Sequence, residues 1–128
     1  MTKDAVLALC AALPGAVEDN PFGDGVVVFK VGGRMFALVA LDGEPGSVSL
    51  KCDPSIAVDL RGRYACVRPG YHLNKRHWNS VDFGDAIEPA EFEWMIEHSY
   101  ELVLRGLTAA KRAEIPELSE GGARPGTE

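Results

Sequence analysis

The sequence has few of the features that mark membrane proteins, disulfide-rich proteins or zinc proteins. None of its apolar runs approaches the roughly 20 residues that a membrane-spanning helix needs, so no membrane partner is expected. Cysteine is scarce: Cys10, Cys52 and Cys66 are odd in number and widely spaced, and they form no CxxC or CxxxH pair. This spacing indicates neither a disulfide framework nor a zinc site. Because each cysteine lies in apolar sequence, buried free thiols are favoured over a redox role.

Positive charge is also in short supply. The chain of 128 residues has a formal net charge of −6, which argues against nonspecific nucleic-acid binding by the molecule as a whole. Its 46% hydrophobic and 25% charged residues are typical of a soluble globular protein, and its length is typical of one domain. The N-terminal stretch MTKDAVLALCAALPGA superficially resembles a signal peptide, but Asp4 interrupts its basic region and its short apolar run is helically periodic. We therefore expect a first helix here and a cytoplasmic protein.

The positive charge that is present is concentrated in one segment. Between Leu60 and Val81 the chain has five basic residues, two histidines and no acid: Arg61, Arg63, Arg68, Lys75 and Arg76, with His72 and His77. The densest part, PGYHLNKRHW at 69–78, also holds two aromatic residues. This segment, called the basic segment below, can form a local electropositive face on an acidic protein.

The hydrophobic patterning predicts helices at both ends of a run of strands. VVVFKV and RMFALVAL are two β-rich runs joined by Gly32 and Gly33, which accept the positive φ of a tight turn, so 26–41 is predicted to be an antiparallel hairpin. The other predicted elements are a helix between Thr2 and Pro14, a strand at 47–52, a helix from Asp53 to about Arg61, an extended segment at 64–67, a strand at 78–83, a long helix from Glu88 to about Leu107, and a short helix from Thr108 to Ile115.

This order predicts an α+β fold. We expect an antiparallel β-sheet with an N-terminal helix, a short middle helix and a long C-terminal helix packed on it, in one domain of residues 1–115. Residues 116–128 have few apolar side chains and are expected to form a disordered tail. Residues 15–25 are predicted to be a polar connection that Phe22 anchors to the core.

The long helix has a clear apolar stripe. Its predicted buried positions are Phe92, Met95, Ile96, Ser99, Leu102, Val103 and Gly106. Trp94 falls off this stripe, so it is expected to be less buried than its neighbours.

Five blocks of the sequence together resemble one protein family. They are LPGAVEDNPFGDG (13–25), VFKVGGRMFAL (28–38), SLKCDP (49–54), PGYHLNKRHWNSV (69–81) and EHSYELVLRGL (97–107), and in this succession the chain resembles the MmcQ/YjbR family. The resemblance implies a fold grouped with frataxin-like (CyaY-like) and secretion-chaperone-like domains. It also implies DNA binding through a "double wing" motif. The family has no established reaction, so we expect neither an enzyme nor a cofactor.

The basic segment supplies the candidate nucleic-acid site. Phosphate contacts are expected from Lys75, Arg76 and His77, with Arg68 from the preceding turn. Asn74 is expected to contact a base edge or sugar, and Tyr71 or Trp78 to stack on an unpaired base. The wings are hairpins such as 26–38, whose turn exposes two further cations. The full candidate set is Arg68, Tyr71, His72, Asn74, Lys75, Arg76, His77, Lys30 and Arg34. So few charges support only weak, salt-dependent binding.

Other interpretations of the same residues stay open. Tyr71 and Trp78 can be core or rim aromatics, Asn74 can cap a turn, and the cations can be merely solvated. A protein-interaction module that uses the sheet or helix surface would show an exposed apolar patch. An enzyme acting near His72, Lys75 and His77 would show a concave pocket there.

Catalytic and metal chemistry find little support in the sequence. Ser99 lies mid-helix without a glycine-rich elbow, so we predict a small residue at a helix–strand contact. Tyr100 is expected to pack at the sheet edge with its hydroxyl on a backbone partner. His72 and His77 have no acid between them to complete a ligand set. The acidic residues of the long helix are interpreted as a solvated face, so no metal is expected.

Overall fold

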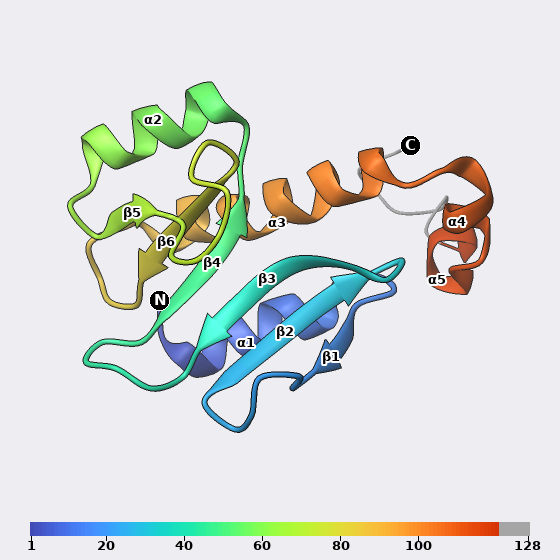
Figure 1. Ribbon diagram of the computed structural model, residues 1–128, viewed down its shortest axis with the longest axis horizontal. Helices are drawn as coiled ribbons and strands as arrows, with labels where there is room; N and C mark the ends of the chain where they lie inside the picture. The colour runs from blue at the N-terminus through green and yellow to red at the C-terminus, as the bar shows by residue number, and fades with distance from the viewer. Residues whose placement is uncertain (121–128) are drawn as a thin grey trace.

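The computed structural model describes residues 1–120 as an α+β domain. Its elements, in chain order, are α1 (Lys3–Ala12), β1 (Val17–Asp19), β2 (Val26–Val31), β3 (Arg34–Ala40), β4 (Ser47–Lys51), α2 (Pro54–Arg63), β5 (Val67–Pro69), β6 (Trp78–Asp82), α3 (Pro89–Gly106), α4 (Ala109–Ala113) and α5 (Pro116–Glu120) (Figure 1).

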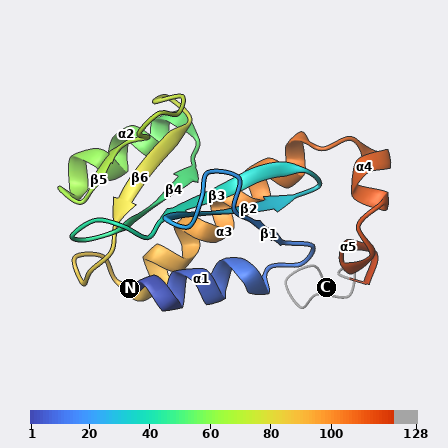
Figure 2. The same cartoon turned by 60° about the horizontal axis from the view of Figure 1, so that its bottom comes forward.

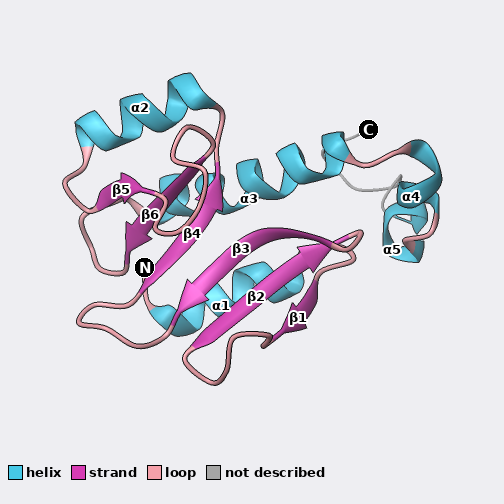
Figure 3. Cartoon of the chain, viewed as in Figure 1, coloured by secondary structure: helices cyan, strands magenta, loops and turns pink. Residues whose placement is uncertain are grey.

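The six strands form one antiparallel sheet in the order β1-β2-β3-β4-β6-β5 (Figure 3). The helices α1 and α3 lie together on one face of this sheet (Figure 2), and α2 packs against β5 and β6. This arrangement confirms the predicted fold class, with an N-terminal, a short middle and a long C-terminal helix packed on an antiparallel sheet.

The predicted hairpin is confirmed. β2 pairs antiparallel with β3, and the turn residues Gly32 and Gly33 have φ values of 59° and 80°. A residue with a Cβ rarely adopts this left-handed conformation, so the two glycines are what allows the tight turn.

The start of α2 also follows the sequence pattern. The Asp53 carboxylate accepts hydrogen bonds from the backbone N–H groups of Ser55 and Ile56, and Pro54 occupies the first turn. The cap satisfies N–H groups that have no partner within the helix, which fixes where α2 begins.

The structure differs in two respects from the prediction for residues 15–25. The structure has a strand there, β1, which pairs with β2 at the edge of the sheet. All three of its side chains are exposed, so it lacks the apolar alternation that would reveal a strand in the sequence. The expectation that Phe22 anchors this segment is wrong, because its side chain is 68% exposed.

The C-terminal segment begins with a helix. Pro116–Glu120 form α5, within the stretch that the composition indicates to be a tail. Proline suits the first turn of a helix, and Leu118 packs half-buried against the core. The rest of the expected tail, 121–128, lies outside the described residues.

The long helix α3 supplies much of the core. Phe92, Met95 and Ile96 are buried and Trp94 is 43% exposed, which confirms the predicted order of exposure. Towards the end of the helix the buried stripe continues through Tyr100 and Leu104 rather than Leu102 and Gly106. An α-helix has 3.6 residues per turn, so buried positions recur after three or four residues. At this end of the helix the prediction assumed a spacing of three, whereas the buried positions are four residues apart.

Candidate functional site

The basic segment covers the end of α2, then β5, most of β6 and the loop between these two strands, residues 70–77 (Figure 1). The Tyr71 N–H donates to the Ser80 hydroxyl at 3.2 Å, and the Ser80 and Ser49 hydroxyl oxygens are 2.7 Å apart. Ser80 alternates along β6 with Asn79 and Val81, which face α2 and α3, so Ser80 points to the opposite face of the sheet. The loop is therefore anchored on the face of the sheet that α1 and α3 leave open.

Two aromatic rings stand at the start of this loop. Tyr71 is 69% exposed, and its ring centroid lies 3.9 Å from that of His72. His72 has a φ of 61°, a left-handed conformation that is uncommon for a residue with a side chain. The Asn74 side-chain oxygen accepts from the Arg76 N–H at 2.9 Å, so Asn74 caps a turn of the loop.

Two cations of the basic segment have acidic partners. Arg63 lies 3.0 Å from a Glu91 oxygen, and Arg68 lies 2.5 Å from an Asp82 oxygen. The sequence predicts a phosphate contact for Arg68, but Asp82 already compensates its charge. The five cations of the segment therefore do not act together as one electropositive face.

The charges of two other cations, Arg61 and Lys75, are not compensated by Glu91 or Asp82. Arg61 donates to the carbonyl oxygens of Ala57 and Lys75, at 3.2 and 3.1 Å, and the Lys75 ammonium donates to the Gly70 carbonyl oxygen at 3.2 Å. A carbonyl oxygen holds a cationic side chain in place without cancelling its charge. The fold therefore brings Arg61 to the backbone of Lys75, which the exposed Arg76 follows in the chain.

The wing cations lie elsewhere. Lys30 forms an ion pair with Asp19 at 3.4 Å on the neighbouring strand β1. Arg34 lies beside Gly106, at the end of α3. Within the sheet, β4 separates this hairpin from β6, so the structure does not join Lys30 and Arg34 to the loop cations.

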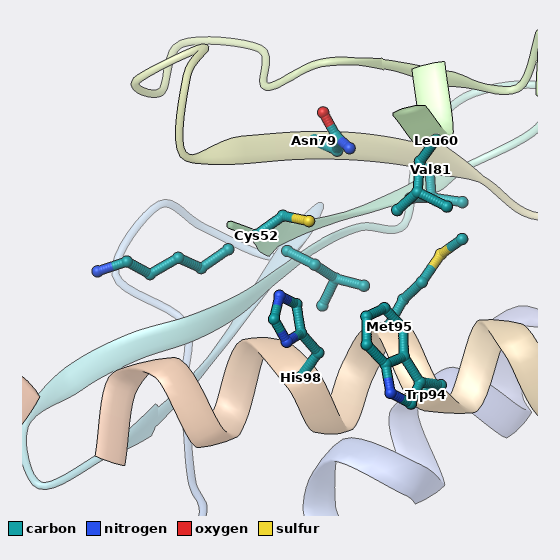
Figure 4. A pocket seen from close by; sticks show the side chains of 9 residues that line it. Cys52, Leu60, Asn79, Val81, Trp94, Met95 and His98 are labelled. Carbon is teal, nitrogen blue, oxygen red and sulfur yellow. The ribbon is translucent and has the colours of Figure 1, made fainter. Parts of the chain in front are cut away.

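A second feature, which the sequence analysis missed, is a cavity of about 10 Å³ between α2, α3 and the sheet (Figure 4). This volume is near the lower limit of the space that one water molecule needs. At its edge the rings of Trp94 and His98 are stacked, 4.6 Å apart and 10° from parallel. The sequence contains a signal for this contact, because two helix residues spaced i, i+4 meet on one face of the helix. The lining residues are Leu50, Lys51, Cys52, Leu60, Asn79, Val81, Trp94, Met95 and His98.

The polar groups beside this cavity form structural contacts. The Asp53 N–H donates to His98 Nε2 at 3.2 Å, so this nitrogen is an unprotonated acceptor. Burial lowers the pKa of His98 below its ordinary value, and the Arg105 charge adds to this effect, against the opposing effect of Asp53. Burial likewise raises the pKa of the Cys52 thiol to about 11, helped by the Asp53 carboxylate. A thiol with so high a pKa is a poor nucleophile near neutral pH.

Ser99 bridges two strands, as its small size at a helix–strand contact suggested. Its hydroxyl donates to the Phe36 carbonyl oxygen at 2.5 Å and accepts from the Lys51 N–H at 2.8 Å. The hydroxyl of Tyr100 donates to the Pro14 carbonyl oxygen, which confirms the expected backbone partner. Both groups are engaged in holding the fold together.

Among residues 1–120, neither the larger hollows nor the side chains that can bind metals give the basic segment a pocket or a metal site. Two hollows, of about 310 and 220 Å³, flank the Gly32–Gly33 turn, and neither is lined by a residue of the basic segment. Across residues 1–120, no three His, Cys, Asp or Glu side chains gather closely enough to hold a metal ion. In the same part of the chain no helix is both long and apolar enough to cross a membrane.

A comparison with protein families identifies the group to which the chain belongs. The family model YjbR matches residues 11–102, most of the chain. The chain belongs to the YjbR family. Among YjbR relatives, the uncharacterized protein YbdF of Escherichia coli O157:H7 is 43% identical over 93 residues, covering 72% of this chain and 74% of YbdF. The uncharacterized protein YjbR of Escherichia coli K12 is 31% identical over 118 residues, covering 92% of this chain and all of that protein.

Two solved structures share the fold of this chain. A crystal structure of a Deinococcus radiodurans protein with a DUF419 domain is 37% identical, with a TM-score of 0.83 over 90% of this chain and 88% of that one. A Pseudomonas syringae protein at 22% identity, with a TM-score of 0.70 over 80% of this chain and 98% of its own, shares the fold. The resemblance that the sequence blocks indicated is thus confirmed at the level of family and fold.

Proposed function

We propose that this YjbR-family domain is a non-enzymatic module that binds nucleic acid weakly through the exposed part of loop 70–77 and the adjoining end of α2. We call this the loop surface, and it consists of Arg61, Tyr71, His72, Lys75 and Arg76. The observation that carries the proposal is the carbonyl tethering of Arg61 and Lys75, which holds two charges at the loop that carries the exposed Tyr71 ring.

The electrostatics set the expected strength. Three cations support about two or three phosphate contacts, so the slope of log affinity against log salt concentration should be about −2 to −3. The chain as a whole carries −6 and repels a polyanion at long range. Binding should therefore be measurable at low salt and lost near physiological salt.

The protein-interaction hypothesis has weaker support. The exposed large apolar side chains among residues 1–120 are those of Val17, Phe22, Val58, Tyr71 and Trp94. Val17 belongs to β1, Val58 to α2 and Trp94 to α3, so these side chains are spread over separate elements. Singly exposed apolar residues are normal on protein surfaces and do not mark a partner site.

The test is fluorescence anisotropy with short labelled DNA oligonucleotides, single-stranded and duplex, at about 50 mM salt. We expect the wild type to bind at least one of them, and the variant combining Arg61→Gln, Lys75→Ala and Arg76→Ala to lose binding. Glutamine at position 61 retains a side-chain hydrogen-bond donor for the carbonyl groups. Thermal unfolding of the variant checks that the domain remains folded.

A charge-matched control separates a local site from bulk electrostatics. Lys3, Lys111 and Arg112 are exposed on α1 and α4, and their joint replacement by Gln, Ala and Ala changes the net charge by the same amount. This control should bind DNA nearly as well as the wild type. Absence of binding by the wild type at low salt, or equal losses in the two triple variants, would refute the proposal.

A further inference from the structure

We infer that the nucleic acid recognised at the loop surface is single-stranded, with one base stacked on the ring of Tyr71. The inference rests on the proposed function and names its ligand class. It follows from three properties of the loop: the backbone beneath Tyr71 is fixed, the ring is exposed, and two side chains that could read a duplex groove, Asn74 and Arg68, are already engaged.

The backbone of Tyr71 is tied to the sheet. Its N–H donates to Ser80, whose hydroxyl also contacts the buried Ser49 hydroxyl. The preceding residue, Gly70, is buried and donates its N–H to the Trp78 carbonyl oxygen at 2.8 Å. Gly70 lies so close to β6 that a Cβ there would come within 2.7 Å of the Trp78 Cβ. An aromatic residue on a fixed backbone loses little conformational freedom when a ligand binds.

The ring of Tyr71 is presented to solvent. It is 69% exposed although its backbone is anchored, and the tilted His72 ring lies against it with centroids 3.9 Å apart. His72 holds this position with a left-handed backbone conformation, which is unfavourable for a residue with a Cβ. Residues held in such conformations cluster at binding sites, where the surrounding structure compensates for the strain.

A duplex offers this loop little to recognise. Its bases are already stacked, so a tyrosine reaches a base face only where the stack is opened. Groove reading uses free donors and acceptors on a helix or ribbon, but the Asn74 side-chain oxygen already accepts from the Arg76 backbone N–H and the Arg68 guanidinium already pairs with Asp82. A single strand presents an open base face to Tyr71 and its phosphates to Lys75 and Arg76, which is the usual combination in single-strand binding.

The experiment compares one labelled DNA oligonucleotide of mixed sequence, alone and annealed to its complement, at the same low salt. We expect the single strand to bind at least about tenfold more tightly, since one stacked base contributes roughly that factor or more. Tyr71→Ala should lose about tenfold in affinity for the single strand and change duplex binding little. Tyr71→Phe keeps the ring and should bind like the wild type.

Trp94→Ala is the matched control. It removes another half-exposed aromatic ring, from α3 rather than from the loop, and should leave single-strand affinity unchanged. Duplex binding as tight as single-strand binding, or a Tyr71→Ala variant that binds the single strand like the wild type, would overturn the inference and leave the proposed function standing. Absence of binding to either DNA would refute both.

Discussion

The two halves of the sheet are held together by different kinds of contact. In the first half, formed by β1, β2 and β3, several tight apolar contacts are decided by shape. Phe36 packs edge-on against Tyr100, with ring centroids 5.4 Å apart. Gly32 lies directly against Leu107, and Gly15 against Ile115, so closely that a Cβ on either glycine would come 2.6 Å from the neighbouring side chain.

The second half, formed by β4, β6 and β5 with α2, has polar contacts between its elements in addition to its apolar core. The Asn79 amide donates to the Ala57 carbonyl oxygen on α2, and the Asp53 N–H donates to His98 on α3. At the other end of α2, the Tyr64 hydroxyl donates to the Glu91 carboxylate. This hydrogen bond lowers the pKa of Glu91 and raises that of Tyr64.

The difference teaches what each half is sensitive to. Contacts decided by shape respond to added volume, whereas hydrogen bonds to ionisable groups respond to lost partners and to pH. Loop 70–77 is exposed and hydrogen-bonded, and it belongs to the second half, where polar contacts help to set the geometry. The following predictions test this contrast, from the largest expected effect to the smallest.

Volume added at the hairpin turn should have the largest effect. Gly32→Ala combines a left-handed backbone with a Cβ that meets Leu107, so we expect a loss of about 2–4 kcal/mol in the free energy of unfolding. Gly33→Ala has the same backbone requirement but nothing within 4 Å of its Cβ, so it should lose only about 1 kcal/mol. Urea unfolding measures both. Equal losses would show that shape does not control this half.

Removal of a buried serine hydroxyl should have an intermediate effect on stability. Ser99→Ala leaves the Phe36 carbonyl and the Lys51 N–H without the hydroxyl that bridges them, which should cost about 2 kcal/mol. Ser49→Ala removes one hydroxyl of the Ser49–Ser80 pair, but Ser80 still accepts from Tyr71, so the loss should be nearer 1 kcal/mol. A larger loss for Ser49→Ala in urea unfolding would contradict this order.

The pH dependence of the polar half should be the smallest effect. The folded-state pKa of His98 is lowered, so the unfolded chain binds its proton more readily and protonation favours unfolding. The stabilising contribution is complete above the unfolded pKa of about 6.5 and is lost as the pH falls through the folded pKa. His98→Gln should flatten the change in urea midpoint between about pH 7 and pH 5. An unchanged slope would mean that His98 titrates alike in both states.

Local pattern was enough to predict much of the fold. The Gly32–Gly33 hairpin, the Asp53 cap of α2 and the exposure of Trp94 each depend on residues that are neighbours in sequence. β1 was missed because it has no apolar side to its pattern, and its stability comes from pairing with β2. The hydrophobic periodicity of a segment indicates whether it forms a helix or a strand, but it does not indicate which strand it pairs with in the sheet.

The candidate site was predictable only in part, for a related reason. Arg68 lies 14 residues from Asp82 and Arg63 lies 28 from Glu91, and strand pairing and helix packing decide that these charges meet. Counting charges along the basic segment therefore overestimated the cations available to a ligand. The exposure of Tyr71 and the tethering of Lys75 likewise depend on how β6 places Ser80 and on how the loop folds back on Gly70.

The positions of the two tryptophans give the molecule two optical reporters. Trp78 lies at the base of loop 70–77, against Gly70, and Trp94 lies on the His98 ring. Indole emission is quenched by a protonated imidazole in ring contact, so the intensity from Trp94 should follow the charge of His98, while Trp78 should respond to what happens at the loop. With Trp94 replaced by phenylalanine, the remaining emission would report from the loop alone, and oligonucleotide binding could be followed without attaching a dye.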